Sequence, residues 1–283
     1  MSDGSFAGPV RLNGSRRRTR TGSAPVPTRR DAPSAYLRGP ACPEHSSGAR
    51  PVAEFRVYTS PSAFPNPQRL RLFCHEKGIA DRIDEVIYDM TPGGEQRGWR
   101  HLKRNPWGET PTLELPDGTY LAETAGIVRF LDGHFPGRRI MGDSALEQGQ
   151  DQMWDDRIWV QILYRLTTAF HVLHEGLGHK LELTRNPQWG EHCRKEAIAH
   201  AGLVDRHLAD GRDWLLGGPE PTFADITLCT AVAFSKFGPV ATPLDERFES
   251  LDRFWQRWKQ RPAFRAAYRD GGGIEELAGL AAN

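Results

Sequence analysis

Hydrophobic periodicity divides the chain near residue 136. Between about residues 54 and 135, short stretches with strand-like alternation take turns with stretches in helical spacing. After Phe135-Pro136-Gly137 only helical spacing remains, over about 146–174, 191–209, 222–237 and 247–260. The pattern predicts an α/β domain over 53–135 followed by an all-helical domain over 136–283.

The expected order of elements in the first domain is β-α-β-α-β-β-α. The strands are expected near 55–58, 86–88, 112–115 and 119–121, and the helices over 66–77, about 95–104 and around 127–131. Pro116-Asp117-Gly118 is a strong turn signal between the last two strands, and Gly78 marks the end of the first helix. We therefore expect a parallel pair of strands extended by an antiparallel hairpin, with helices covering the faces of the sheet.

A third region precedes these two domains. Residues 1–50 contain nine Arg, no Lys, three acids, six Gly and six Pro, whereas all eight Trp lie beyond residue 50. A segment with a net charge of +6 and few large apolar groups cannot offset the entropy of ordering, so residues 1–52 are expected to form a disordered basic tail. The run Arg16-Arg17-Arg18-Thr19-Arg20 is either a targeting or nucleic-acid patch or part of a solvated tail, which a wrongly chosen start codon would also produce.

Net charge and cysteine spacing exclude several function classes. The whole chain has 37 Lys+Arg against 36 Asp+Glu, so its charge gives no case for nucleic acid or a membrane as a partner. No apolar run approaches the roughly 20 residues that cross a bilayer. Four scattered cysteines without a C-x-x-C motif predict neither a disulfide framework nor a zinc site. We expect a cytoplasmic protein without a metal.

Short motifs in both domains resemble those of the soluble glutathione S-transferases. The family pattern N-x-x-G-x-V-P-x-L…DG…L-x-E-S is matched by Asn105-Pro106-Trp107-Gly108-Glu109-Thr110-Pro111-Thr112-Leu113, Asp117-Gly118-Thr119-Tyr120-Leu121 and Glu123-Thr124. The matches in the second half are Phe223-Ala224-Asp225-Ile226 and Gln260-Arg261-Pro262. The resemblance covers about residues 54–268 and implies a thioredoxin-like α/β domain followed by an all-α domain, usually in a homodimer. Pro65-Asn66-Pro67 followed by Arg69-Leu70-Arg71 is most similar to a bacterial and fungal branch that lacks the usual catalytic Tyr, Ser or Cys.

The resemblance assigns glutathione binding to Arg97, Thr110, Pro111, Glu123 and Thr124. A cis Thr110-Pro111 bond would turn the backbone of Thr110 outward as a free strand edge for the cysteinyl residue. Glu123 would accept the ammonium of the γ-glutamyl group, while the Thr124 hydroxyl and the helix-start N–H groups would hold its carboxylate. Arg97 is the expected cation for the glycine carboxylate, with Lys103 and His101 as alternatives.

The resemblance leaves more than one candidate for the group that activates the thiol. A thiol with a pKa of ~8.5 is only a few per cent thiolate at neutral pH, so the enzyme must supply a donor or a base. Phe64 aligns with the usual Ser or Cys and cannot donate to sulfur. Asn66 is a nearby candidate, because its amide could donate to the thiolate, although it could equally cap the first helix. Ser60 and Ser62 are interpreted as turn residues.

A second constellation lies on the first helix of the all-helical domain. Thr167 and His171 are spaced i,i+4 and share a face with Tyr164. In the branch that this chain resembles, a hydroxyl and a His at these places hold a water that serves as the base, and a neutral imidazole can accept the proton through it. Without the resemblance, a His on a half-apolar helix is more often structural. The gaps between His171, His174 and His179 match no i,i+4 metal pair.

These motifs together predict a glutathione S-transferase that joins the glutathione thiolate to a hydrophobic electrophile. The expected walls of the substrate pocket are Phe64, Trp107, Trp154 and Tyr164. One alternative keeps the site but changes the reaction to glutathione-dependent reduction, isomerisation or biosynthetic C–S bond formation. The other alternative is a catalytically silent glutathione-binding module, because the fold does not by itself imply activity.

Two further expectations concern the core of the helical domain. Thr222 followed three residues later by Asp225 resembles a capping box, so Asp225 is expected to fix the start of a buried helix. Trp255, Trp258 and Phe264 are expected in the hydrophobic core. Neither expectation requires a ligand.

Overall fold

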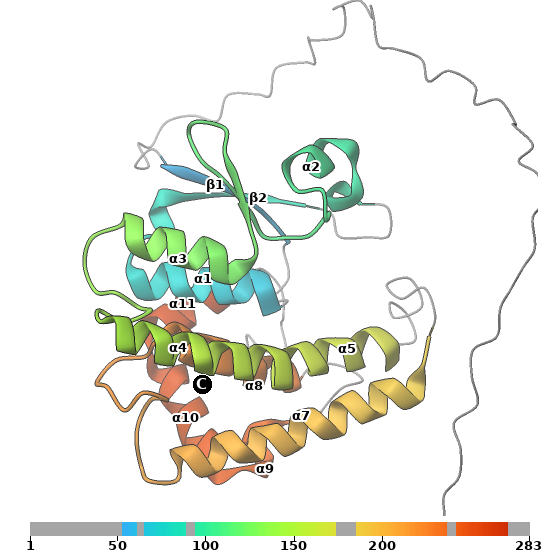
Figure 1. The fold of residues 1–283 in the computed structure, drawn as a ribbon, viewed down its shortest axis with the longest axis vertical. Helices are drawn as coiled ribbons and strands as arrows, with labels where there is room; N and C mark the ends of the chain where they lie inside the picture. The colour runs from blue at the N-terminus through green and yellow to red at the C-terminus, as the bar shows by residue number, and fades with distance from the viewer. Residues whose placement is uncertain (1–52, 61–64, 89–93, 174–184, 237–241, 271–283) are drawn as a thin grey trace, which may run out of the picture. The chain divides into compact units, whose positions relative to one another are not determined.

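The computed structural model describes residues 53–60, 65–88, 94–173, 185–236 and 242–270 (Figure 1). The predictions for the tail over 1–52 and for Ser62, Phe64, His174 and His179 lie outside these ranges. Within the described ranges, no helix combines the length and the apolar character needed to cross a membrane. Cys74, Cys193 and Cys229 are buried free thiols.

The first domain contains a four-stranded mixed sheet. Its elements are β1 (Phe55–Thr59), α1 (Pro65–Lys77), η1 (Ala80–Arg82), β2 (Ile83–Ile87), η2 (Glu95–Arg97), α2 (Trp99–Arg104), β3 (Thr112–Glu114), β4 (Tyr120–Ala122) and α3 (Thr124–His134). The strand order is β2-β1-β3-β4, with β1 parallel to β2 and β3 antiparallel to both β1 and β4. The predicted parallel pair with an added hairpin is therefore confirmed.

Turn positions agree with the sequence, whereas the start of β2 does not. Gly78 after α1 and Gly118 in the hairpin have φ values of 72° and 83°, which is the backbone region that favours glycine. Strand β2 begins three residues earlier than the predicted 86–88, at Ile83. Its polar residues Asp84 and Glu85 form ion pairs with Arg56 and Arg71, and these charges obscure the apolar pattern.

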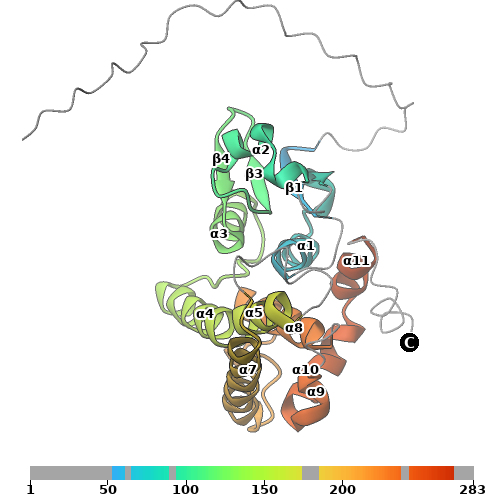
Figure 2. The same cartoon turned by 90° about the vertical axis from the view of Figure 1, so that its right-hand side faces the viewer.

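Helices α1 and α3 lie together between the sheet and the helical domain (Figures 1 and 2). The inner faces of these helices and the sheet bury Leu72, Phe73, Ile127, Val128, Leu131, Val57 and Leu113. This apolar layer is continuous with the core of the helical domain. Removing this apolar surface from water holds the starts of α1 and α3 side by side.

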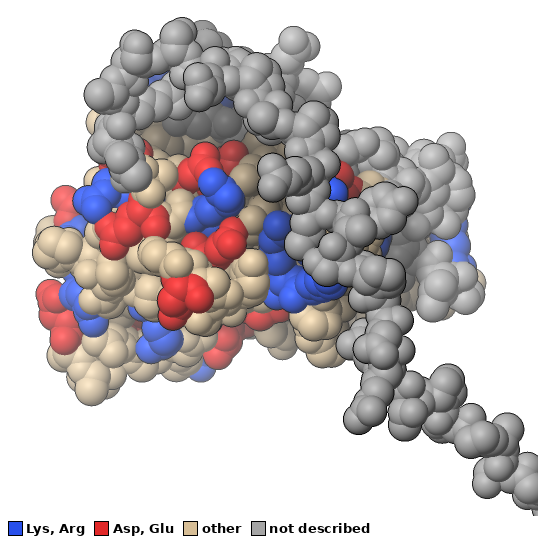
Figure 3. Space-filling view, turned by 90° about the horizontal axis from the view of Figure 1, so that it is seen from above, with Lys and Arg blue, Asp and Glu red and all other residues tan. Residues whose placement is uncertain are grey.

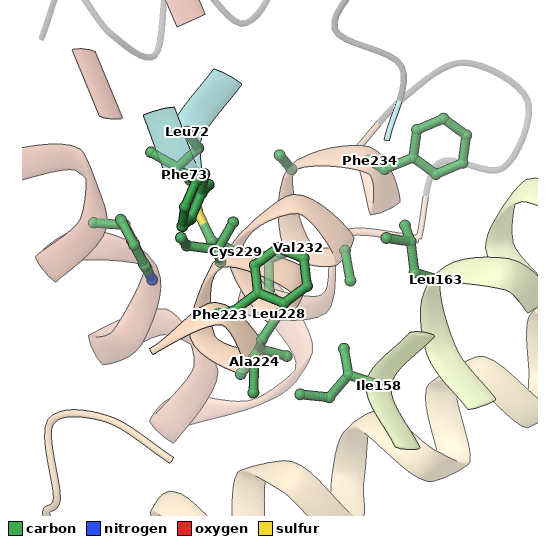
Figure 4. Packing of buried hydrophobic residues seen from close by; sticks show 14 of the residues in the cluster. Leu72, Phe73, Ile158, Leu163, Phe223, Ala224, Leu228, Cys229, Val232 and Phe234 are labelled. Carbon is green, nitrogen blue, oxygen red and sulfur yellow. The ribbon is translucent and has the colours of Figure 1, made fainter. Parts of the chain in front are cut away.

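The second domain contains helices and no strand among its described residues, as predicted. Its elements are α4 (Ala145–Ile158), the π-helical turn η3 (Trp159–Leu163), α5 (Tyr164–Leu173), α7 (Pro187–Leu208), α8 (Phe223–Ser235), α9 (Leu244–Arg247), α10 (Glu249–Gln260) and α11 (Pro262–Asp270). Every residue of α8 is buried. Figure 4 shows Phe223, Leu228 and Cys229 of this helix packed among side chains from neighbouring elements, including Phe73 of α1 and Ile158 of α4.

The start of α8 is fixed by a buried carboxylate. Asp225 accepts hydrogen bonds from the N–H of Leu215 at 2.9 Å and from the N–H and hydroxyl of Thr222 at 2.8 and 3.1 Å. This confirms the predicted role of Asp225 at a buried helix start. The core prediction is also confirmed, because Trp255, Trp258 and Phe264 are all buried.

Charged side chains of both signs are intermixed on the face of the molecule drawn in Figure 3, where the grey segments leave it visible. This mixture agrees with the near balance of 37 basic and 36 acidic residues in the sequence. Ion pairs such as Arg56 with Asp84 neutralise charges locally. The uncovered part of that face therefore presents no large field of a single sign.

Candidate functional site

Side-chain hydrogen bonds shape the loop that leads into β3. The Asn105 side chain accepts from the N–H of Trp107 at 3.1 Å and donates to the carbonyl of Glu109 at 3.0 Å. The same Glu109 carbonyl bonds to Nε2 of His101 at 2.9 Å and accepts from the Thr112 hydroxyl at 3.2 Å. The Glu109 carbonyl thus forms hydrogen bonds with three side chains. These bonds hold the loop before Thr110 in one conformation.

Gly108 allows this loop to pack closely against η2 and α2. Its φ is 67°, and an added Cβ would lie 3.0 Å from Nη1 of Arg97, 3.1 Å from Leu102 and 3.2 Å from the carbonyl of Gln96. Arg97 also donates to the carbonyl of Trp107 at 3.1 Å. The exposed Arg97 side chain is therefore anchored beside the loop that precedes Pro111.

The Thr110-Pro111 peptide bond is cis, as predicted. Strand β3 begins at the next residue, Thr112, which pairs with Tyr58 of β1. Among the described residues, neither the N–H nor the carbonyl of Thr110 is engaged in a hydrogen bond. Thr110 therefore offers the free backbone groups that an added extended peptide would need.

The start of α3 lies next to this edge. Thr112 pairs with Ala122 across the hairpin, so the residues before Thr112 and after Ala122 leave the sheet together. Glu123 has φ 62° and is the sole non-glycine residue with a positive φ in the described ranges. Such strained conformations cluster at functional sites. The Thr124 hydroxyl lies 3.4 Å from the carbonyl of Asn66, which joins the start of α3 to that of α1.

Asn66 lies in the first turn of α1, because the helix begins at Pro65. The predicted capping role is therefore wrong, since a capping residue precedes the helix. Its Oδ1 accepts a hydrogen bond from Nη1 of Arg69 at 3.4 Å. Its amide nitrogen makes no hydrogen bond to a described residue. Asn66 thus retains a donor for a ligand at the junction of α1 and α3.

Arg69 itself is held by the helical domain. Its Nε donates to the Thr227 hydroxyl at 3.0 Å, and its Nη2 donates to both carboxylate oxygens of Asp155 at 2.9 and 3.2 Å. The guanidinium carbon lies 4.9 Å from the ring centre of Trp159 and equally far from that of Phe223. Arg69 and Asp155 are each only 3% exposed at the side chain.

Burial acts on the pKa values of both partners in this ion pair. It is the largest influence in each case, lowering the pKa of Arg69 and raising that of Asp155. The mutual attraction of the two charges and their hydrogen bonds oppose both shifts. The two-point contact keeps the guanidinium and the carboxylate in a single arrangement.

Thr167, His171 and Tyr164 occupy one face of α5, just beyond the π-helical turn. The Thr167 hydroxyl donates to the carbonyl of Tyr164 at 2.8 Å, and the Thr168 hydroxyl donates to the same carbonyl at 2.9 Å. His171 is half-buried and Tyr164 is exposed. Because the hydroxyl proton of Thr167 is already donated, the oxygen is left to accept a hydrogen bond.

Two of the predicted pocket walls differ in their placement. Trp107 is exposed beside the loop before Pro111, as a wall at the mouth of the site requires. Trp154 instead packs on His207 of α7, with ring centres 4.3 Å apart. The prediction that Trp154 is a wall of the substrate pocket is therefore wrong, because its ring faces α7. Trp159 instead packs on Arg69, with its ring centre 5.9 Å from that of Tyr164.

The alternatives to Arg97 as the glycine-binding cation are not supported. His101 is fully buried, bonds to the Glu109 carbonyl and has a pKa lowered mainly by burial, so it is a neutral structural residue. The Lys103 ammonium lies 4.7 Å from the ring centre of Trp99 on the outer side of α2. Arg97 is the one of the three that bonds to the loop before Pro111 and also has an exposed side chain.

Known proteins match both domains. Residues 65–134 match the family described as "Glutathione S-transferase, N-terminal domain", and residues 187–270 match "Glutathione S-transferase, C-terminal domain". The crystal structure of a glutathione S-transferase domain-containing protein from Marinobacter aquaeolei VT8 is 32% identical, with a TM-score of 0.67 over 74% of this chain and 99% of that chain. The chain belongs to the glutathione S-transferase family.

Two further glutathione S-transferase comparisons come from Saccharomyces cerevisiae. The yeast protein named Glutathione S-transferase 2 is 28% identical over 219 residues, which are 77% of this chain and 91% of the yeast protein. The crystal structure of yeast Gtt2 is 29% identical, with a TM-score of 0.68 over 75% of this chain and 99% of that chain. The glutathione S-transferase fold expected from the resemblance, an α/β domain followed by an all-helical domain, is therefore confirmed.

The contacts of Arg69 with Thr227 and Asp155 are not predicted from the sequence of this glutathione S-transferase. The signal available was Arg69 directly before Leu70 in a helix that is expected to pack on the sheet, because buried arginines are almost always paired. Asp151 and Asp155, spaced i,i+4 on the first helix of the other domain, were the corresponding acidic signal. Nothing in the sequence indicates that Asp155 and not Asp151 meets Arg69.

Proposed function

We propose that this glutathione S-transferase binds glutathione at the junction of α1, α3 and the loop before β3, and conjugates its thiol to a hydrophobic electrophile. The observation that carries the proposal is the free backbone of Thr110 at the cis Pro111 turn, next to the strained Glu123. Three elements therefore each contribute a polar group that a tripeptide thiol requires. These groups are the backbone of Thr110, the carboxylate of Glu123 and the side-chain amide of Asn66.

The residues fit glutathione group by group. Thr110 would pair with the cysteinyl backbone through its N–H and carbonyl. Glu123 would accept the γ-glutamyl ammonium, while Thr124 and the first N–H groups of α3 would hold the γ-glutamyl carboxylate. Arg97 would bind the glycine carboxylate. Glutathione supplies the nucleophilic sulfur, and the protein supplies its position and charge state.

We assign thiol activation to two groups with different tasks. Asn66 would donate through its amide nitrogen to the sulfur, which stabilises the thiolate. Thr167 and His171 would hold a water between them, with the Thr167 oxygen accepting one of its hydrogens and the imidazole the other. The lone pairs of this water then remain available for the thiol proton, which passes on to His171.

Aromatic side chains near this site favour a hydrophobic electrophile. Tyr164 and Trp107 are exposed, and Trp159 lies next to Tyr164. Phe64 would complete the pocket beside Asn66, as the sequence predicts. Conjugation of hydrophobic electrophiles would serve detoxification, and the buried thiols of Cys74, Cys193 and Cys229 suit a reducing cytoplasm.

The proposal is tested by titrating the protein with glutathione in a calorimeter and by measuring conjugation of 1-chloro-2,4-dinitrobenzene. Replacing Glu123 with Gln removes a charge-assisted hydrogen bond, so we expect glutathione to bind about tenfold more weakly. Asp81→Asn is the matched control, because this exposed carboxylate precedes β2 at the opposite end of the sheet. Absence of glutathione binding by the wild type would contradict the proposed function.

We also propose that the protein forms a homodimer through α4. Leu146 and Met153 of α4 and Val160 of the π-helical turn that follows it recur every seven residues and are 71%, 38% and 47% exposed. They form an apolar stripe along one face of this helical segment. Arg129 of the neighbouring α3 donates to Gln152 at 2.8 Å, which extends this face with polar groups. Exposed apolar stripes with a polar surround are typical of protein interfaces.

Introducing a charged residue into the apolar stripe tests whether the protein forms the proposed homodimer. In sedimentation experiments the wild type is expected at twice the mass of one chain, and Val160→Glu at the mass of one chain, because an unpaired carboxylate cannot be buried in an apolar interface. Leu203→Glu on α7 is the control, since Leu203 is comparably exposed, at 52%, outside the stripe. A wild type that sediments as one chain would contradict the dimer.

A further inference from the structure

The orientation of the Asn66 side chain depends on Arg69. An arginine carries only donors, so the atom of Asn66 that faces Nη1 of Arg69 must be the amide oxygen. The amide nitrogen then points away from Arg69. This is the orientation in which the nitrogen can donate to a ligand at the start of α1.

Each nitrogen of the Arg69 guanidinium has a separate task. Nε bonds to Thr227 of α8, and Nη2 bonds to Asp155 of α4. Within the described residues, Nη1 makes a single hydrogen bond, which is the one to Asn66. A purely structural link between the domains would be complete with the first two contacts. The third contact connects the domain interface with the site.

The guanidinium cannot easily take another position. Trp159 and Phe223 each lie 4.9 Å from its central carbon, and Asp155 engages it with both oxygens. A planar group that is held through Nε and Nη2 and packed against two rings has one orientation available. Residues of the helical domain therefore fix the direction in which Nη1 points.

We infer that Arg69 is a positioning residue for the glutathione thiol: it holds the amide oxygen of Asn66 so that the amide nitrogen is presented to the sulfur. Asp155 and Thr227 of the helical domain hold Arg69 in this position. The inference rests on the proposed function and deepens it, because it makes thiolate stabilisation depend on contacts between the two domains. Arg69 itself does not touch the thiol.

The test measures the pKa of the glutathione thiol bound to the protein, from the ultraviolet absorbance of its thiolate as a function of pH. Arg69→Lys keeps the charge for Asp155 but has no planar fork that reaches Asp155, Thr227 and Asn66 together. We expect this variant to raise the pKa of the bound thiol by about one pH unit, a tenfold loss of thiolate. Asn66→Ala is expected to raise it equally, and the double variant no further.

A matched control separates positioning from stability. Lys77 forms a second buried ion pair from α1, with Asp132 of α3, and does not contact Asn66. Lys77→Met is expected to lower the melting temperature as much as Arg69→Lys does, yet to leave the pKa of the bound thiol unchanged. The glutathione dissociation constant of Arg69→Lys should stay within about twofold of wild type, because the other glutathione contacts are intact.

A readout without glutathione tests the same contact directly. The side-chain amide resonances of Asn66, identified by their absence from Asn66→Ala, should move in Arg69→Lys and stay in place in Lys77→Met. Two results would overturn the inference while glutathione binding persists. One is that the Asn66 amide resonances do not move in Arg69→Lys. The other is that the double variant raises the thiol pKa by the sum of the two single shifts. Loss of glutathione binding in the wild type would instead overturn the proposed function, and this inference with it.

Discussion

Replacing His171 with alanine should lower the rate of glutathione conjugation about a hundredfold or more at neutral pH. A thiol with a pKa of ~8.5 is only a few per cent ionised there, so the reaction depends on a group that removes the proton. His171 is half-buried on α5, on the same face as Thr167 and Tyr164. The measurement is kcat/KM for 1-chloro-2,4-dinitrobenzene across pH, in which the variant should regain activity only as the solvent deprotonates the thiol.

Two neighbouring threonines provide a matched pair for the same mechanism. Thr167 and Thr168 both donate to the carbonyl of Tyr164, at 2.8 and 2.9 Å. Valine at either position therefore removes an equivalent hydrogen bond to the Tyr164 carbonyl, whereas the proposed water lies between His171 and Thr167 alone, which are spaced i,i+4. We expect Thr167→Val to lose at least tenfold in kcat/KM and Thr168→Val to stay near wild type.

Several results would contradict this assignment. Equal losses in Thr167→Val and Thr168→Val would show that helix stability, not the water, is affected. Full activity in His171→Ala together with a collapse in Asn66→Ala would assign thiol activation to Asn66 alone. Because glutathione binding depends on residues of the other domain, the dissociation constant should be unchanged in His171→Ala whichever mechanism operates.

Local signals in the sequence were sufficient for most of the fold. The hairpin around Gly118 and the helix stop at Gly78 were predicted because positive φ values favour glycine at such turns. The start of α8 was predicted because Asp225 and Thr222 are only three residues apart. The start of β2 was missed because Asp84 and Glu85, which form ion pairs with distant arginines, interrupt the apolar pattern.

Long-range contacts limit how much of the candidate site can be predicted from the sequence. Thr227 is 158 residues from Arg69 in sequence, and neither residue type alone indicates the other. The wrong placement of Trp154 has the same origin, since helical spacing gives relative faces but does not say which face α7 covers. The π-helical turn at Trp159–Leu163 also lacks a sequence signal, although it carries Trp159 to the Arg69 guanidinium. Such insertions are frequent at functional sites.

Stability should fall as pH rises from about 4 to 7 because of Asp151. This residue is fully buried on α4: its Oδ1 accepts from the N–H of Ala224 at 2.8 Å, whereas Oδ2 has no hydrogen bond within the described residues. Burial is the main reason that its pKa rises from 3.8 to about 7, and nearby Asp155 and Asp225 add to the rise. The Ala224 bond and the Thr222 side chain oppose it.

The sign follows from the two pKa values. Because the folded state binds the Asp151 proton more tightly than the unfolded chain does, its contribution is complete below about pH 4 and is lost as pH rises through about 7. A pKa raised from 3.8 to about 7 corresponds to roughly 4 kcal/mol. Asp225, with a pKa raised to about 6 by burial, acts in the same direction.

Asp151→Asn removes the ionisation while keeping an acceptor for Ala224. Between pH 5 and pH 8, the free energy of unfolding of Asp151→Asn in urea, measured at fixed protein concentration, should increase relative to that of the wild type by about 2.5 kcal/mol. Asp205→Asn is the control, since Asp205 also accepts from helix-start N–H groups, those of Ser250 and Leu251, but is only half-buried. Parallel curves for Asp151→Asn and wild type over this range would show that Asp151 is ionised in the folded protein throughout, because its desolvation would then be fully offset by the Ala224 and Thr222 contacts.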